Sequence, residues 1–446
     1  MSTQVSARSF AKLYIPILLE TLCSMLAGMV DTVMLSTVGD AAVGAVGTAN
    51  TYTSLFIIMF NIVSSGMTAV MTQYIGAKKA GVAYQARQLG LVFSLAAGTL
   101  LSLFLFAFSG NVLEVVGAAP LLMDHAKTYL RIVGSFLLLN ALIPVFSNYL
   151  RAFGHTRPPL AAALLSNGVN LILNALFLFV LHSGVAGVAA ATVISRALNL
   201  VIVMTASRLL VHAKEDPERM RGRDVFAQII RVGLPSALET AAYHVAMTLT
   251  IRFLNQMDSE GLNVTARAYA VQITNFSFCA AAALASTNAI LTGWRIGEGD
   301  YESCDRGTKR AACIGIAIAA GLELLFALGS GFLLRMFTDD PAMIALASRL
   351  LVIDIALEVG RAANLVFGQA LKTSGDALFT TVIAVIFMYL CMVGGTWFFG
   401  IHLGWMAVGA YVGLASDECI RAVCMALRWR SGKWRTKGFI QRESAQ

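Results

Sequence analysis

The chain has 446 residues, of which 57% are hydrophobic and only 13% charged, and its formal net charge is +8. Soluble domains average roughly 25% charged residues, and one soluble core cannot hide this much apolar surface, whereas a lipid bilayer can. The low count of 8 prolines and the lack of Gly-X-Y, Gln/Asn or Pro-rich tracts exclude fibrous and disordered classes. The composition therefore predicts an all-α integral membrane protein.

A membrane-spanning helix needs about 20 mostly apolar residues, and the sequence contains twelve such stretches. They are predicted at 10–35, 50–74, 88–112, 126–150, 158–181, 185–211, 226–254, 264–294, 310–335, 342–370, 377–400 and 403–427. The first is longer than the roughly 7–15 apolar residues of a secretory signal, so we interpret it as a retained span. The charged segment 212–224 predicts a cytoplasmic linker between a six-helix N-terminal lobe, 1–211, and a six-helix C-terminal lobe with a basic tail, 225–446.

The first predicted span contains two acids, Glu20 and Asp31. They are eleven residues apart, which is nearly three helical turns, so both lie on one face. An ionisable group in a span costs ~2.5–3.5 kcal/mol on the insertion scale, which favours a functional reason such as cation coupling. The alternative is that each acid lies near a membrane interface, Glu20 at the inner side and Asp31 at the outer side.

The fifth span carries a polar stripe, with Asn167, Asn170 and Asn174 at positions i, i+3 and i+7. Amides at this spacing either line a cavity or bond to a neighbouring helix. Both interpretations stay open, and Asn170 and Asn174 are candidate site residues.

In the seventh span, Glu239 follows Pro235 by one turn. The proline frees a backbone carbonyl and permits a bend beside the carboxylate, which favours an ion-binding role; the alternative is a charge at the inner helix end. In the eighth span, Gln272 and Asn275 at i and i+3 lie near two phenylalanines. They form a candidate substrate wall for flat cations, although such aromatic residues often serve packing.

The tenth span has the densest set of ionisable residues. Glu358 and Arg361 are i, i+3 partners, Asp354 lies one turn before Glu358, and Asn364 follows on the same helix. Two carboxylates and one guanidinium leave a net negative charge, which suits cation binding in a cleft of low dielectric constant. The alternative is an ion pair that holds two helices together.

The distribution of Lys and Arg predicts the orientation, because cytoplasmic loops are enriched in both. With the N-terminus inside, 24 of the 33 basic residues fall on the inner side and six on the outer side. This predicts a multi-pass protein of the bacterial cytoplasmic membrane with both termini in the cytoplasm. The net charge then needs no nucleic-acid partner, because inner loops facing anionic lipid account for it.

The two halves of the chain resemble each other at a nearly constant offset. Pro16–Thr21 resembles Pro235–Thr240, an offset of 219, and Leu150–Gly154 resembles Leu371–Gly375, an offset of 221. Six helices per half is an even number, so both halves enter the membrane from the same side. The sequence thus predicts parallel repeats related by a pseudo-two-fold axis along the membrane normal, an arrangement used by transporters.

Motifs for catalysis and nucleotide binding are absent from the sequence. There is no GxSxG, HExxH or GxxxxGK[ST] pattern, and the seven cysteines form no His/Cys cluster with zinc-site spacing. We therefore expect no enzyme and no cofactor, and an ion gradient as the energy source.

These features together resemble the MATE (multidrug and toxic compound extrusion) transporters. The resemblance covers nearly the whole chain and rests on the order and spacing of short motifs: Val30–Met34, Gly66–Gly76, Leu150–Thr156, Asn167/Asn170/Asn174, Gly233–Pro235 with Glu239, Glu358–Asn364 and Leu371–Asp376.

The resemblance implies antiport in which Na⁺ or H⁺ enters while an organic compound leaves. It implies coupling at the acids of the first and seventh helices, Asp31 and Glu239, with Na⁺ bound at one of them. Where family members often carry an acid in the tenth helix, this chain has Arg361, with Glu358 one turn earlier. That departure implies a Glu358–Arg361 charge pair that ion binding at Glu239 rearranges.

The predicted function is a secondary active antiporter that exports small cationic or amphipathic organic compounds in exchange for Na⁺ or H⁺. Its partners are the small-molecule substrate and the lipid bilayer, and we expect a monomer. One alternative is a flippase for a lipid-linked precursor, which would have a more basic cavity than the mostly acidic or neutral candidates here. The other is a membrane-embedded lipid enzyme.

Overall fold

The computed structural model describes residues 7–115, 120–258 and 261–440. All regular elements in these ranges are helices, and the ranges contain no strand. Each of the twelve predicted spans falls on a helical segment, which confirms the all-α prediction. The end of the predicted basic tail, 441–446, lies outside the described residues.

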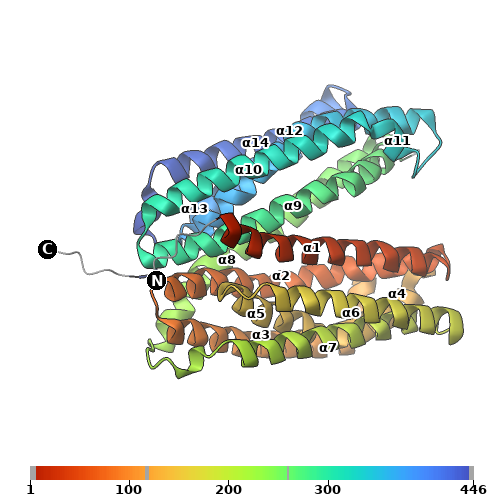
Figure 1. Ribbon diagram of the computed structural model, residues 1–446. Coiled ribbons are helices and arrows are strands. Elements are labelled where there is room, and N and C mark those ends of the chain that lie inside the picture. Colours follow the sequence, from red (N-terminus) through yellow and green to blue (C-terminus); the bar gives the residue numbers. More distant parts are fainter. Residues whose placement is uncertain (1–6, 116–119, 259–260, 441–446) are drawn as a thin grey trace. The chain divides into compact units, whose positions relative to one another are not determined.

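The chain folds into two compact units, Met1–Gly233 and Leu234–Gln446. The helices of the first unit are α1 (Ala7–Ser36), α2 (Asp40–Gly76), α3 (Ala80–Val115), α4 (Pro120–Ser135), α5 (Leu137–Ala152), α6 (Arg157–Ala175) with its continuation η1 (Leu176–Val180), α7 (Gly184–Leu210) and η2 (Ala213–Glu215). In this unit α3 packs against α2, α4 and α5, while α1 packs against α6 (Figure 1). Small residues such as Ala45 and Ala49 let these helices approach around a core that includes Leu105 and Leu130.

The second unit begins inside a continuous helix, α8 (Gly222–Met257), whose first turns belong to the first unit. Its other helices are α9 (Leu262–Glu298), α10 (Tyr301–Leu328), α11 (Ser330–Leu334), α12 (Pro341–Thr373), α13 (Ala377–Phe387) with η3 (Met388–Val393) and η4 (Thr396–His402), α14 (Met406–Arg430) and η5 (Lys433–Thr436). The central helix of this unit is α12, which packs against α9, α10 and α14 (Figure 1).

Eight helices of the described ranges are long and apolar enough to cross a membrane, and the pair α4–α5, bent by 45°, makes a ninth. The remaining long helices, α8, α12 and α14, contain ionisable side chains that interrupt their apolar stretches. Ionisable residues inside a membrane span are usually paired or functional. We therefore expect a functional site along these three helices.

The segment that follows α7 is held on the first unit. The amide of Gly81 donates to Asp216 Oδ2 at 2.9 Å, Lys79 Nζ lies 3.2 Å from Glu218 Oε2, and Gln85 Nε2 donates to the Met220 carbonyl at 2.7 Å. The amides of Glu218 and Gly81, which donate to Asp216, hold the pKa of that carboxyl below its usual value. The predicted linker, 212–224, therefore includes a docked segment, and α8 begins before it ends.

The segment that follows α14 is likewise held on the second unit. Trp434 of η5 stacks on Trp429 with ring centroids 4.1 Å apart, and its Nε1 donates to the Trp429 carbonyl at 2.9 Å. Trp429 Nε1 in turn donates to Asp305 Oδ1 of α10 at 2.9 Å. Both indole rings are buried, so this part of the tail is part of the fold.

Candidate functional site

A cavity of about 300 Å³ in the second unit gathers ionisable side chains from the three interrupted helices. Its charged lining residues are Glu239, Arg361, Lys372, Glu418 and Arg421. Tyr243 and Phe278 add aromatic surface, and Asn364 adds an amide. The cavity thus combines paired charges with ring faces, the lining that a small organic ion requires.

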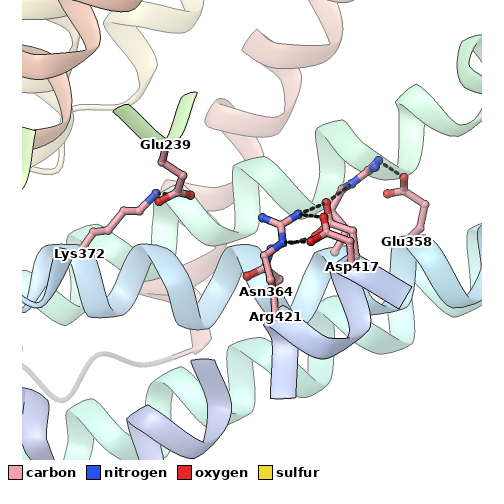
Figure 2. Close-up of polar contacts among 8 residues, drawn as sticks. Glu239, Glu358, Asn364, Lys372, Asp417 and Arg421 are labelled. Atoms are coloured by element: carbon pink, nitrogen blue, oxygen red, sulfur yellow. Dashed lines mark hydrogen bonds and ion pairs between the residues drawn. The ribbon is translucent and has the colours of Figure 1, made fainter. Parts of the chain in front are cut away.

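Glu239 is bound to a lysine at the far end of another helix. Lys372 Nζ, in the last turn of α12, donates to Glu239 Oε1 at 2.9 Å, and Thr381 Oγ1 donates to Oε2 at 3.3 Å. Figure 2 shows the two side chains pointing toward each other from α8 and α12. A lysine is favourable at a helix C-terminus because of the helix dipole, and the acid follows Pro235 by one turn as the sequence indicates.

A chain of ion pairs connects α12 with α14. Arg361 bonds to Glu358 on its own helix, and its Nε lies 3.3 Å from Glu418 Oε1. Arg421 lies 2.9 Å from Glu418 Oε1 and 2.7 Å from Asp417 Oδ2 (Figure 2). Glu418 therefore bridges two guanidinium groups, and Asn364 Nδ2 donates to its other oxygen at 2.8 Å.

A second cavity of about 130 Å³ in the same unit lies along α12 and includes Asp354, Glu358, Arg361, Arg267 and Asn275 in its lining. Among the residues that the structure describes, one oxygen of Asp354 and one of Glu358 have no hydrogen-bond partner. All four predicted residues of the tenth span therefore face one or the other cavity: Asp354, Glu358, Arg361 and Asn364.

The first unit contains a smaller polar cluster around Asp31. Asn174 Nδ2 donates to Asp31 Oδ1 at 2.8 Å. With its amide nitrogen turned toward the acid, Asn170 donates to the same oxygen at 2.8 Å. Arg196 of α7 is the cation whose charge acts on Asp31. The asparagine stripe of α6 therefore bonds to α1, the second of the two interpretations that the sequence left open.

Glu20, the other acid of α1, lies in an ion pair. Arg151 Nη2, at the end of α5, lies 2.6 Å from Glu20 Oε1, and Arg151 Nη1 donates to Asn148 Oδ1 at 3.2 Å. Glu20 and Asp31 thus bind different helices, α5 and α6, from one face of α1.

Two of the predicted residues of α9 differ in their surroundings. Asn275 lines the smaller cavity, whereas Gln272 is exposed and lines neither of the two cavities. The flat surface beside the larger cavity comes from Phe278, not from Gln272.

Sequence reasoning missed several participants, namely Lys372, Asp417, Glu418, Arg421 and a buried acid of α10, Glu323. The signal for the α14 residues was present, because three ionisable residues at i, i+1 and i+4 interrupt an apolar span. Lys372 lies in the last turn of α12, where the sequence indicates only one more inner-side basic residue. Within the described ranges, no group of three or more His, Cys, Asp or Glu side chains is placed to hold a metal ion.

The sequence of this chain is similar to those of known transporters. The family model MatE matches two stretches, residues 16–176 and 235–397. An uncharacterized transporter, YisQ, of Bacillus subtilis is 29% identical over 95% of this chain and 94% of its own length. A probable multidrug resistance protein, NorM, of Thermotoga maritima is 24% identical over 98% of this chain and 95% of its own.

The fold agrees with the sequence match. A solved structure described as the outward-facing conformation of a multidrug resistance MATE family transporter aligns with a TM-score of 0.87, at 20% identity, over 95% of both chains. The two matched stretches begin at Pro16 and Pro235, the first residues of the repeat seen in the sequence. The chain is therefore a multi-pass membrane transporter that belongs to the MatE family.

Proposed function

We propose that this transporter is a secondary active antiporter that exports small cationic or amphipathic organic compounds in exchange for Na⁺ or H⁺. The observation that carries the proposal is the Glu239–Lys372 pair in the wall of the larger cavity. The proposal places the chain in a bacterial cytoplasmic membrane with both termini in the cytoplasm, acting as a monomer. It needs no cofactor besides the coupling ion.

The pair offers a simple way to make ion and substrate exclude each other. Lys372 already neutralises Glu239, so a cationic group of a substrate binds the acid by taking the place of the lysine ammonium. A proton or Na⁺ on Glu239 removes the charge that this group needs. A ligand shifts a conformational equilibrium only through different affinities for the two states, and competition at one carboxylate supplies such a difference.

The arginine chain next to Glu239 extends this competition through the cavity. Glu418 is shared between Arg361 and Arg421, so a change of charge at one end alters which guanidinium it holds. In the smaller polar cluster, Asp31 is a second candidate coupling acid, because two asparagine amides and one arginine charge surround it.

The basic residues of the larger cavity are a point in favour of the flippase alternative. The sequence predicted a mostly acidic or neutral lining, yet Arg361, Lys372 and Arg421 outnumber Glu239 and Glu418 there. A lipid-linked phosphate would bind such groups. Each of these three cations is nevertheless bound to a carboxylate, which leaves the antiporter as the better supported function.

The test is transport of a cationic dye in proteoliposomes that contain the purified protein. An inward Na⁺ gradient and an inward proton gradient are each imposed alone, and a third sample has neither. The proposal expects one of the two gradients to accelerate dye efflux. If neither does, and the protein instead moves a fluorescent phosphate-bearing lipid between leaflets, the flippase alternative holds.

A further inference from the structure

One acid of the second unit is fully buried and takes no part in the ion pairs described above. Glu323 of α10 is 0% exposed, and among the described residues neither of its carboxylate oxygens makes a hydrogen bond of normal geometry. The polar side chain that acts on it is Ser277 of α9, whose hydroxyl is close enough to donate to the carboxylate but lies outside normal hydrogen-bond geometry. This arrangement is unusual because buried polar groups are nearly always hydrogen-bonded.

The charges that act on Glu323 come from α12. They are the carboxylate of Glu358 and the guanidinium of Arg361, and Arg361 is already committed to Glu358 and Glu418. Helix α10 packs on α9 and α12. The cation whose charge acts on Glu323 is therefore already paired with two other carboxylates.

Asp354 is in a similar position one helix away. It is 2% exposed, its Oδ2 has no partner, and the charges of Glu323, Glu358, Arg361 and Arg267 act on it. Of the two cations, Arg361 is paired with Glu358 and Glu418. Arg267 Nη2 lies 3.0 Å from the uncharged Met247 Sδ, and its Nε has no hydrogen-bond partner among the described residues. The buried hydroxyl of Tyr411 on α14 completes the surroundings.

An ionised carboxylate without a partner costs several kcal/mol in a protein interior, so such a group takes up a proton instead. A bound metal ion would be another way to neutralise the acids. Within the described residues, no group of three or more His, Cys, Asp or Glu side chains is placed to hold a metal ion. A proton needs only one carboxylate, which Glu323 supplies.

The smaller cavity supplies a route for this proton. Asp354 and Glu358 line it, whereas Glu323 lies outside its lining. A water molecule takes up about 30 Å³ in the liquid, so a cavity of about 130 Å³ has room for water beside Asp354. A proton that leaves Glu323 for that water would have to pass by way of one of the two lining acids, as in the carboxylate relays of other transporters.

We propose that Glu323 is a proton-carrying site of the second unit and exchanges its proton with the smaller cavity through Asp354. Asp354 first releases its own proton to water in the smaller cavity. The O–H bond of the Glu323 carboxylic acid then breaks, the electron pair stays on the Glu323 oxygen, and the proton passes to the vacated Asp354 carboxylate. The ionised Glu323 is stabilised when Arg361 turns from Glu418 toward it. This inference rests on the proposed antiport and assigns its coupling ion in this unit as H⁺.

The experiment compares the unaltered protein with Glu323→Gln and Glu302→Gln. Glutamine mimics the protonated acid in shape and charge, and Glu302 is an exposed acid in the first turn of the same helix. Proton release on dye binding is measured with a pH indicator in weakly buffered detergent solution, and dye efflux is measured under a proton gradient alone. We expect Glu323→Gln to lose both signals and Glu302→Gln to keep both.

An infrared difference spectrum of the unaltered protein makes the test independent of the variant's folding. Dye binding should remove the carbonyl band of a protonated carboxylic acid, and a spectrum without this loss overturns the proposal. Proton-driven efflux that persists in Glu323→Gln also overturns it. If Na⁺ alone drives the unaltered protein, the antiporter stands and the proton site falls; if neither gradient drives it, the proposed function itself fails.

Discussion

Lys372 Nζ lies 2.9 Å from Glu239 Oε1, and the first unit contains a counterpart of this pair in Arg151 and Glu20, 2.6 Å apart. The two acids are separated by 219 residues and the two basic residues by 221, which are the offsets of the sequence repeat. Each repeat therefore binds an acid of its first helix to a basic residue at the end of its fourth helical pass. Only the pair of the second unit uses a lysine, whose compact ammonium is easier to displace than a guanidinium fork.

The two partners of the Glu239–Lys372 pair should differ in their effects on transport. Glu239→Gln should keep normal membrane expression and lose gradient-driven efflux, because the competing charge is gone. Lys372→Gln should keep the gradient dependence and bind cationic dye about tenfold more tightly, as expected when a competing charge-assisted bond of roughly 1.5 kcal/mol is removed. Dye titration measures the affinity, and efflux normalised to protein amount measures the transport. If the two variants have the same dye affinity and the same gradient-driven efflux, substrate and lysine do not compete for Glu239.

Glu418 should be important for stability, because it is buried and bridges two arginines. Glu418→Gln leaves Arg361 with Glu358 and Arg421 with Asp417. Because each arginine keeps one carboxylate, the loss should stay below the about 3–5 kcal/mol that is typical when a buried charge is left unpaired. Thermal unfolding in detergent should show a clear loss. The exposed Glu302→Gln serves as the control and should stay within about 0.5 kcal/mol of the unaltered protein; a similar midpoint for both variants contradicts the bridge.

Asp31→Asn should reduce ion-driven efflux less than Glu239→Gln does. The substitution removes the charge on which the amides of Asn174 and Asn170 converge, but it leaves the cavity of the second unit intact. Asn167→Ala is the matched control, since that amide lies on the same stripe of α6 but donates to the Cys23 sulfur, at 3.5 Å. The measurement is the initial rate of dye efflux in each variant. An unchanged rate in Asp31→Asn would mean that Asp31 has a structural role only.

The proposed orientation can be checked with two cysteines at exposed positions. Glu215→Cys should be shielded from a membrane-impermeant thiol reagent in intact cells, and Ser183→Cys should be labelled. After permeabilisation both should react, which confirms that each is accessible. Labelling of Glu215→Cys from outside would reverse the topology.

The docked linker should respond to pH through Asp216. Its pKa is lowered in the fold because backbone amides donate to it, so its contribution to docking is complete above the unfolded pKa of about 3.9 and is lost as the pH falls through the folded value. Hydrogen exchange of the linker amides should be faster in Asp216→Asn than in the unaltered protein at neutral pH. The difference should vanish in acid, and exposed Glu215→Gln should show none at either pH.

Much of the architecture could be predicted from the sequence, because apolar stretches of bilayer length are long-range signals that no single residue can erase. The constant offset between the two halves can also be read from the sequence alone. The two stretches of the family match begin at Pro16 and Pro235, where the two copies of the repeat begin. The acids Asp31, Glu239 and Glu358 were found because charge in an apolar stretch is conspicuous.

The partners of those acids could not be predicted in the same way. Lys372 lies 133 residues from Glu239 along the chain, and its position at a helix end looks like that of any inner-loop lysine. Gln272 satisfies the i, i+3 spacing yet is exposed, since spacing says that two residues share a face but not which surface that face meets. Glu323 lies inside the predicted span 310–335, so the signal that identified Asp31 and Glu239 was available for it as well.

The stacked indoles at the end of the chain also have a spectroscopic consequence. Two of the five tryptophans lie with centroids 4.1 Å apart and an interplanar angle of 7°, a geometry in which their excited states couple. Both rings are buried and one bonds to a carboxylate of α10. Intrinsic fluorescence and near-ultraviolet circular dichroism of the unlabelled protein thus report on the attachment of its C-terminal segment. Release of that segment during transport would register in the optical signal without any added dye.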